Sequence, residues 1–314
     1  MKKEKTKTLI VIGVMVLMSL IFSGCQSAQQ DELAADETLS VTVSIPPQAY
    51  FVEQIAGDAV QINVMVGSGD EPHTYEPTPE QMRLLSNSQV FYSIGVEYEQ
   101  NWVPRFQDTN PDLIIVDSAS GIQRIAIADH DHQEGEDQHN EEEGHGHDQE
   151  GENLDPHVWL SPENGKIIAA NILDSLITLI PEGESAFQDN FNELIAEIDT
   201  LETNIETTLS DISHRTFMVF HPTWGYFADQ FDLEQVPVQV GGQEPSPQEL
   251  ANLVEVARDE NIRVIFIQPS FDSASAKAIA TEIDATIALA DPLERNWLEN
   301  LGAVADAFAA ALSD

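Results

Sequence analysis

The chain has 314 residues, with 13 Lys and Arg against 55 Asp and Glu, and a formal net charge of −42 at pH 7. An apolar content of 42% excludes a wholly disordered chain, and the length suits one large or two medium domains. Nucleic acid is excluded as a partner, since phosphate binding needs clustered Lys and Arg. Such an excess of carboxylate indicates either a cationic partner or adaptation to salty surroundings.

The first 25 residues predict export and a lipid anchor. A lysine-rich start precedes an apolar run over residues 9–22, which is too short for an ordinary membrane-spanning helix. Phe22-Ser23-Gly24-Cys25 resembles a bacterial lipobox, in which the Cys is lipidated and becomes the first mature residue. Residues 1–24 are therefore predicted to be a lipoprotein signal peptide that leaves Cys25 anchored to the outer side of the cell membrane. An ordinary signal peptide with an incidental Cys is the alternative.

Residues 25–37 are polar and predict a tether, and residues 38–180 predict a first α/β lobe. Within this lobe Thr78-Pro79-Glu80-Gln81 has the pattern of a capping box that opens a helix. Alternation of strands with helices predicts parallel pairing. The strands are expected at 38–45, 60–66, 89–95 and 112–117, and the helices at 46–57, at 78–87 and from 162 onward.

Residues 129–152 interrupt this lobe with a segment that contains eleven acids, five His and no apolar residue. Such a segment has nothing to place in a core, so we expect a solvated, disordered loop. Its histidines predict weak, accessory metal binding; they are His130, His132, His139, His145 and His147.

A long helix and a second lobe follow. Apolar residues at steps of three and four, from Phe187 to Ile212, predict one helix over 184–212 within a linking segment 181–212. A dimeric coiled coil is the alternative for this helix. Residues 213–314 predict a second α/β lobe, in which Ser246-Pro247-Gln248-Glu249 forms another capping box. Its strands are expected at 216–220, 236–240, 263–268 and 286–290, and its helices at 224–231, 246–260, 274–284 and from 296 onward.

Four histidines lie outside the acidic loop. His73 follows a predicted strand, His221 ends another, and His157 lies where ordered sequence resumes after the loop. Ligands of open α/β sheets bind beyond the carboxyl ends of strands, so His73 and His221 are well placed for binding. His214 precedes a strand beside Arg215 and has the pattern of a surface residue.

Four motifs in this order resemble the zinc-binding lipoproteins of ABC importers: PHTYEPTP, DPHVW, FHPTWGYFADQF and EPSPQEL. The resemblance spans residues 38–314 and implies two pseudo-symmetric α/β lobes joined by one rigid helix, with the metal in the cleft between them. It implies a monomeric extracytoplasmic receptor that captures Zn²⁺ and delivers it to a membrane permease and its ATPase.

The resemblance also implies the ligands. By motif, His73 and His157 are the ligands of the first lobe and His221 comes from the second. A carboxylate after the last strand, here Asp291, is the fourth, although Asp291 to Glu294 also fits a helix start. Some zinc members use an acid directly before the first His. Here that position is Pro72, with Glu71 one residue further back, so this variant is not favoured.

Three imidazoles favour Zn²⁺, because Mn²⁺ prefers more oxygen ligands. Copper would also bind such a site tightly. A binding protein for manganese or another divalent metal, a surface adhesin and a zinc buffer are the alternative functions. An enzyme is not expected, because HExxH, GxSxG and phosphate-loop motifs are missing from the sequence. The longest apolar runs of the mature chain are too short for a permease.

Overall fold

The computed structural model describes residues 38–67, 69–127, 154–239, 243–269 and 273–313. The chain divides into two compact units, Met1–Thr38 and Leu39–Asp314, and all described helices and strands lie in the second. The predicted signal peptide (1–24), the lipidated Cys25, the tether (25–37) and the acidic loop (129–152) with its five histidines lie outside the described residues.

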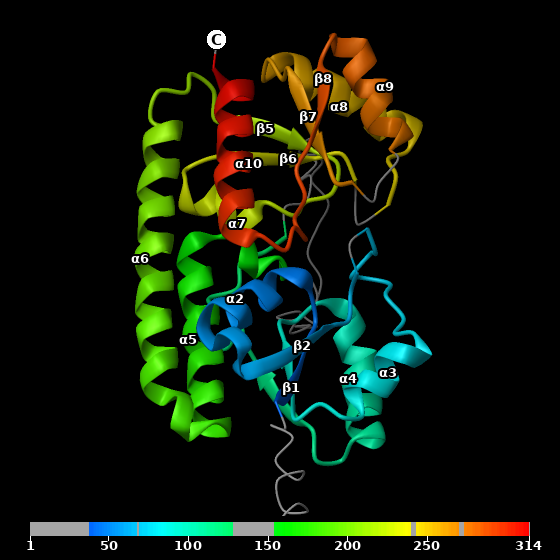
Figure 1. The fold of residues 1–314 in the computed structure, drawn as a ribbon. Coiled ribbons are helices and arrows are strands. Elements are labelled where there is room, and N and C mark those ends of the chain that lie inside the picture. Colours follow the sequence, from blue (N-terminus) through cyan, green and yellow to red (C-terminus); the bar gives the residue numbers. More distant parts are fainter. Residues whose placement is uncertain (1–37, 68, 128–153, 240–242, 270–272, 314) are drawn as a thin grey trace, which may run out of the picture. The chain divides into compact units, whose positions relative to one another are not determined.

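The first lobe is built on a four-stranded parallel sheet with the strand order β2-β1-β3-β4 (Figure 1). The central strand β1 alternates Val41 and Val43 with the buried Thr42, and it pairs with β2 and β3 on either side. The strands are β1 (Leu39–Val43), β2 (Val60–Val64), β3 (Val90–Ser93) and β4 (Ile114–Asp117). The helices are α2 (Pro46–Ala56), α3 (Pro79–Leu85) and α4 (Glu97–Thr109), with a 3₁₀ turn at Gly57–Ala59.

The second lobe repeats this arrangement. Its sheet has the order β6-β5-β7-β8, and all of its pairings are parallel. Its strands are β5 (Thr216–Val219), β6 (Glu234–Pro237), β7 (Val264–Ile267) and β8 (Thr286–Leu289). Its helices are α7 (Gly225–Gln230), α8 (Pro247–Asp259), α9 (Ala274–Ile283) and α10 (Trp297–Leu312). Each sheet places its first strand between its second and third, which confirms the predicted pseudo-symmetric α/β architecture.

One long helix, α6 (Glu184–Leu209), connects the lobes. α5 (Pro162–Leu179) leads through a 3₁₀ turn at Pro181–Gly183 into α6, which contacts α2 and α5 of the first lobe and α10 of the second. The buried stripe of α6 includes Phe187, Leu194 and Leu209. Because this stripe packs on helices of its own chain, the structure supports the linking helix over the dimeric coiled coil.

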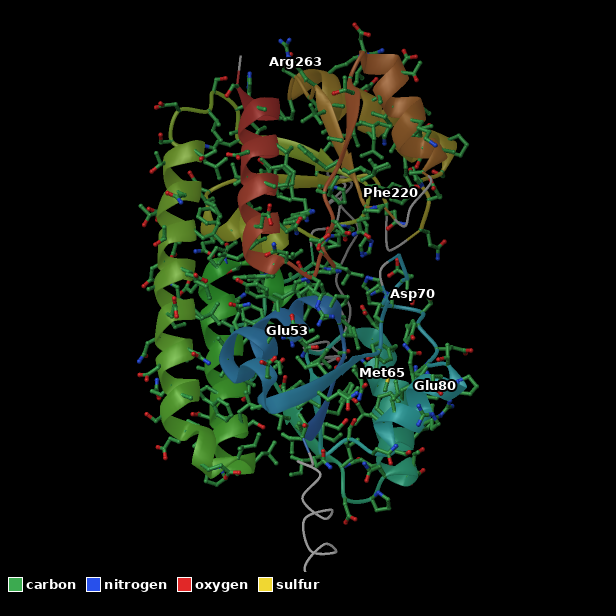
Figure 2. The ribbon with its side chains drawn as sticks, in the orientation of Figure 1. Glu53, Met65, Asp70, Glu80, Phe220 and Arg263 are labelled. Carbon is green, nitrogen blue, oxygen red and sulfur yellow. The ribbon has the colours of Figure 1, made fainter. Side chains whose placement is uncertain are left out.

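The lobes also share a core. One hydrophobic cluster runs from β1 through α5 and α6 to Phe308 of α10. Glu53 of α2, labelled in Figure 2, forms a partly exposed ion pair with Arg295 just before α10. This ion pair is a further contact between the lobes. Among the described residues, no helix has the length and apolarity that a membrane span requires.

Three elements differ from the sequence predictions. α4 was not predicted, because Pro104 interrupts its pattern and only Tyr98, Glu99 and Phe106 are buried. Proline lacks the N–H that would bond the carbonyl four residues earlier, so it is a poor helix signal. β6 begins two residues earlier than expected, at Glu234. α6 ends at Leu209 and not at residue 212.

Candidate metal centre

His73 reaches the centre from the loop between β2 and α3. The loop turns at Gly67, whose N–H donates to Asp70 Oδ2 at 3.0 Å. The backbone N–H of His73 donates to Glu71 Oε1 at 3.2 Å, which draws the glutamate side chain back toward the histidine. α3 then begins with the predicted capping box, in which Thr78 and Gln81 bond each other's backbone N–H. The loop is thus held at both ends.

His157 and His221 come from more buried surroundings. His157 directly precedes the 3₁₀ turn Val158–Leu160 and is 3% exposed. His221 follows β5, where Pro222 ends the extended chain, and it is 8% exposed. His214 lies at the opposite end of β5, where its Nε2 is 3.4 Å from Asn261 Nδ2.

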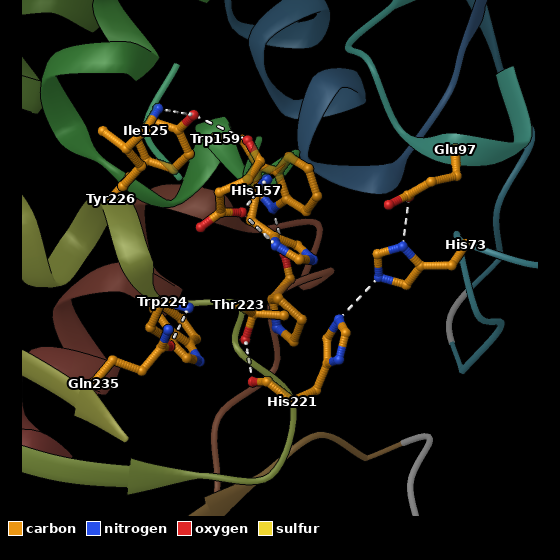
Figure 3. A network of polar contacts seen from close by, with 12 residues as sticks. His73, Glu97, Ile125, His157, Trp159, His221, Thr223, Trp224, Tyr226 and Gln235 are labelled. Atoms are coloured by element: carbon orange, nitrogen blue, oxygen red, sulfur yellow. Dashed lines mark hydrogen bonds and ion pairs between the residues drawn. The ribbon is translucent and has the colours of Figure 1, made fainter. Parts of the chain in front are cut away.

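The structure brings His73, His157 and His221 together (Figure 3). One ring nitrogen of each lies within 4.8 Å of the other two, and these three side chains are called the His cluster below. Nε2 of His73 is 2.9 Å from Nε2 of His221. Among the described residues, the His cluster is the one group of His, Cys, Asp or Glu with spacing suited to a metal ion.

The other nitrogen of each ring faces an oxygen. His157 Nδ1 is 2.7 Å from Asp155 Oδ1, and His221 Nδ1 is 2.7 Å from Gln239 Oε1. His73 Nδ1 is 2.5 Å from Glu97 Oε2, at the start of α4. With Nδ1–H donating to these oxygens, Nε2 is the nitrogen of each ring that can bind a metal ion once the proton between His73 and His221 is displaced. An oxygen on Nδ1 is the usual support of a metal-bound imidazole.

The pKa values of His73 and His221 are shifted in opposite directions. Burial opposes protonation of His73, but the hydrogen bond and charge of Glu97 outweigh it and raise the pKa of His73. Burial, together with the neighbouring His157 and His73, lowers the pKa of His221 to about 3. In the metal-free protein, a proton on His73 Nε2 can therefore be shared with His221. A metal ion that binds there has to displace this proton.

Asp155 is completely buried and joins the centre to both lobes. Its Oδ1 also accepts the backbone N–H of His157 at 2.9 Å, and its backbone carbonyl accepts the Tyr226 hydroxyl at 2.9 Å. Oδ2 packs against Gly225, where an added Cβ would lie 2.5 Å away. Gly225 is therefore required for Asp155 to keep its place beside His157.

Glu71 and Asp291 are the two candidates for a fourth ligand. Oε1 of Glu71 is 3.5 Å from His73 Nε2, and its Oε2 is buried without a hydrogen-bond partner. Neither Glu71 nor Asp291, the residue implied by motif, is a member of the described group of close ligand atoms. Oδ1 of Asp291 accepts the Leu293 N–H at 2.9 Å in a turn that precedes α10, so Asp291 does not begin a helix.

Sequence reasoning missed Glu97 and Gln239 and did not favour Glu71. Position alone could have drawn attention to Glu71, because it is two residues from His73 in a turn-rich loop. The contacts of Glu97 and Gln239 depend on tertiary placement, since they lie 24 and 18 residues from their histidines.

Comparison with known proteins identifies the family. The sequence matches "ZnuA: Zinc-uptake complex component A periplasmic" over residues 41–311. The chain belongs to the ZnuA family. It is 29% identical over 295 residues to the high-affinity zinc uptake system protein ZnuA of Bacillus subtilis (strain 168), and the match covers 93% of this chain and 89% of that protein.

Further members of the family are similar to this chain in sequence and structure. A crystal structure of ZnuA is 37% identical, has a TM-score of 0.79, and is covered completely by 88% of this chain. The zinc-binding protein AdcA of Streptococcus pyogenes serotype M3 (strain ATCC BAA-595 / MGAS315) is 28% identical over 289 residues. The match covers 90% of this chain but spans only 56% of AdcA. ZnuA-family membership places the chain among transport proteins that bind a solute.

Proposed function

We propose that this ZnuA-family chain is an extracytoplasmic receptor that binds Zn²⁺ through the His cluster and delivers it to an ABC permease. The observation that carries the proposal is the convergence of three Nε2 atoms from separate segments, each ring supported by an oxygen on Nδ1. Names of relatives that describe zinc uptake and zinc binding support the same cargo.

The donor set supports zinc over manganese. Three imidazole nitrogens suit a borderline-soft ion, whereas Mn²⁺ prefers carboxylate and carbonyl oxygens. Among the described residues, Glu71 is a carboxylate in contact with Nε2 of His73. We propose Glu71 as the fourth ligand, because its Oε1 already lies 3.5 Å from His73 Nε2. Asp291 remains the alternative implied by motif.

The remaining parts of the proposal concern residues outside the described structure and partner proteins. Cys25 would carry the lipid anchor, and the receptor would act as a monomer with a membrane permease and its ATPase. The histidines of the 129–152 loop would bind metal weakly and in rapid exchange, since ordering such a segment costs about 1–2 kcal/mol per residue. Its carboxylates would concentrate cations near the site.

Metal competition distinguishes the proposed zinc receptor from a manganese-binding protein. Metal-free protein is dialysed against equal buffered free Zn²⁺ and Mn²⁺, and the bound metal is measured by elemental analysis. We expect the tight site to hold zinc almost completely. Deletion of residues 129–152 should remove weak sites and leave one tight site. Recovery of mainly manganese, or loss of the tight site on loop deletion with the fold intact, would contradict the proposal.

Three His and an open position are also the layout of a catalytic zinc, although the sequence does not predict an enzyme. Turnover of an ester or peptide by the zinc-loaded protein that disappears in His-cluster variants would support an enzymatic role. Membership of a transport family favours binding and release of the ion instead.

A further inference from the structure

The three oxygens that face the His cluster differ in charge. Asp155 and Glu97 present carboxylates to His157 and His73, whereas Gln239 presents a neutral amide oxygen to His221. All three can accept an Nδ1–H, so all three can orient a ring. Only the carboxylates can also stabilise a cation that binds on the opposite nitrogen.

His73 is the ligand that depends most on its oxygen partner. Its side chain is 22% exposed, against 4% for His157, and it projects from a loop without regular structure between β2 and α3. His157, by contrast, donates both its backbone N–H and its ring N–H to Asp155. The orientation of His73 is therefore less determined by the surrounding chain.

Glu97 is well placed to support His73. It is the first residue of α4, where a carboxylate is stabilised by the helix dipole. Its side chain is 47% exposed, so the contact between Glu97 and His73 lies on the solvent side of the centre. A dication bound by three neutral imidazoles and one carboxylate keeps a net positive charge that its ligands do not compensate. The negative charge of Glu97 is close enough to contribute.

Building on the proposed zinc site, we infer that Glu97 is a positioning residue that sets zinc affinity through His73 in two ways. Its oxygen holds the Nδ1–H so that Nε2 faces the ion, and its charge strengthens the bond between Nε2 and zinc. Gln239 performs the first task for His221 without the second. Glu97 and Gln239 can therefore be compared as a charged and a neutral support of a histidine in the same site.

Variants of Glu97 and Gln239 separate the two roles of Glu97. Glu97→Gln keeps the acceptor and removes the charge, whereas Glu97→Ala removes both. The double variant Glu97→Gln with Gln239→Glu moves the charge to the other side of the centre. Glu53→Gln is the matched control, because its carboxylate is 43% exposed and pairs with Arg295. Zinc affinity is measured by chelator competition at fixed pH and ionic strength.

We expect Glu97→Ala to weaken zinc binding by about 10–100-fold, the usual effect of losing such a support. Glu97→Gln should fall between this variant and the wild type, and the double variant should recover part of the loss. Glu53→Gln should bind as the wild type does. The ¹⁵N chemical shifts of labelled histidine in metal-free protein at pH 8 should show His73 protonated on Nδ1 in the wild type and Glu97→Gln. A mixture of tautomers is expected in Glu97→Ala.

Failure of this inference is distinct from failure of the zinc site. If His73→Ala weakens binding but Glu97→Gln binds as tightly as the wild type, the charge contribution is refuted. An unchanged tautomer in Glu97→Ala refutes the positioning role. If Glu97→Ala does not fold, Glu97→Gln still tests the charge contribution, because its side chain has the same shape, and Glu97→Leu tests the positioning role by the His73 tautomer. Wild-type affinity in His73→Ala would instead refute the zinc site itself.

Discussion

The indole N–H of Trp297 donates a hydrogen bond of 2.5 Å to the backbone carbonyl of Trp159, two residues after His157. Trp159 in turn donates its own indole N–H to the carbonyl of Pro292, at 2.6 Å. Both side chains are 1% exposed, and Trp297 lies over Gly165, where an added Cβ would be 2.5 Å from the ring. These two hydrogen bonds, called the Trp clasp below, join the segment that carries His157 to Pro292 and to the start of α10.

Loss of one donor should weaken the Trp clasp measurably. Trp297→Phe leaves the Trp159 carbonyl buried without its partner, which should lower the free energy of unfolding by about 1–3 kcal/mol. Urea unfolding followed by circular dichroism measures this change. Trp102→Phe on α4 is the control, because Trp102 is only half-buried and packs against Arg105. Equal losses in the two variants would show that the Trp clasp adds nothing.

Removal of any imidazole of the His cluster should weaken tight zinc binding by orders of magnitude. His73→Ala, His157→Ala and His221→Ala each delete one of three converging nitrogens. His214→Ala should leave binding unchanged, because His214 lies at the other end of β5 beside Asn261. Calorimetry on protein without residues 129–152 distinguishes these cases, and three unaltered isotherms would refute the assignment.

The two candidates for the fourth ligand make opposite predictions. Glu71→Gln should weaken zinc binding more than Asp291→Asn does, because Glu71 Oε1 lies near His73 Nε2 while Asp291 Oδ1 is bonded to the Leu293 N–H. Chelator competition at one pH ranks the two variants. A larger loss in Asp291→Asn would favour the ligand implied by motif and would require the Asp291 side chain to leave its turn.

Glu99 should make stability depend on pH. Burial raises the pKa of its carboxyl from the ordinary 4.5 to about 7, although the backbone N–H groups of Ile94 and Gly95 donate to it. A raised pKa in the folded state gives stability that is complete below the unfolded pKa and is lost as the pH rises toward 7.

Glu99→Gln keeps an acceptor for these N–H groups and removes the titration. Relative to the wild type, its free energy of unfolding should therefore rise by about 2–3 kcal/mol between pH 4.5 and pH 7.5. Urea unfolding of both proteins across this range measures the difference. A difference that does not vary with pH would show that Glu99 is as easily ionised in the folded protein as in the unfolded one.

The sequence predicted the elements of this fold well where local chemistry determines them. The capping boxes at Thr78 and Ser246 are present as expected, with Gln81 and Glu249 completing them. The buried apolar steps of α6 likewise predicted a single long helix. Both signals depend on residues within a few positions of one another, so they can be recognised in a linear sequence. α4 was not predicted because Pro104 interrupts its sequence pattern.

The candidate site was predictable only in part. His73, His157 and His221 were recognisable from motif order and position after strands, and the structure brings them together. Glu97 and Gln239 could not be found in this way, because their contacts form only when distant elements pack. The proposed fourth ligand, Glu71, was also not predicted from the sequence. The geometry of the loop, and not its spacing, places Glu71 beside His73.

Crystallography of the zinc-loaded protein, with data collected on both sides of the zinc absorption edge, tests the central claim most directly. The claim predicts one strong anomalous peak, bonded to Nε2 of His73, His157 and His221 at about 2.0–2.1 Å. A peak elsewhere, or a His cluster without zinc in crystals grown at saturating metal, would contradict it.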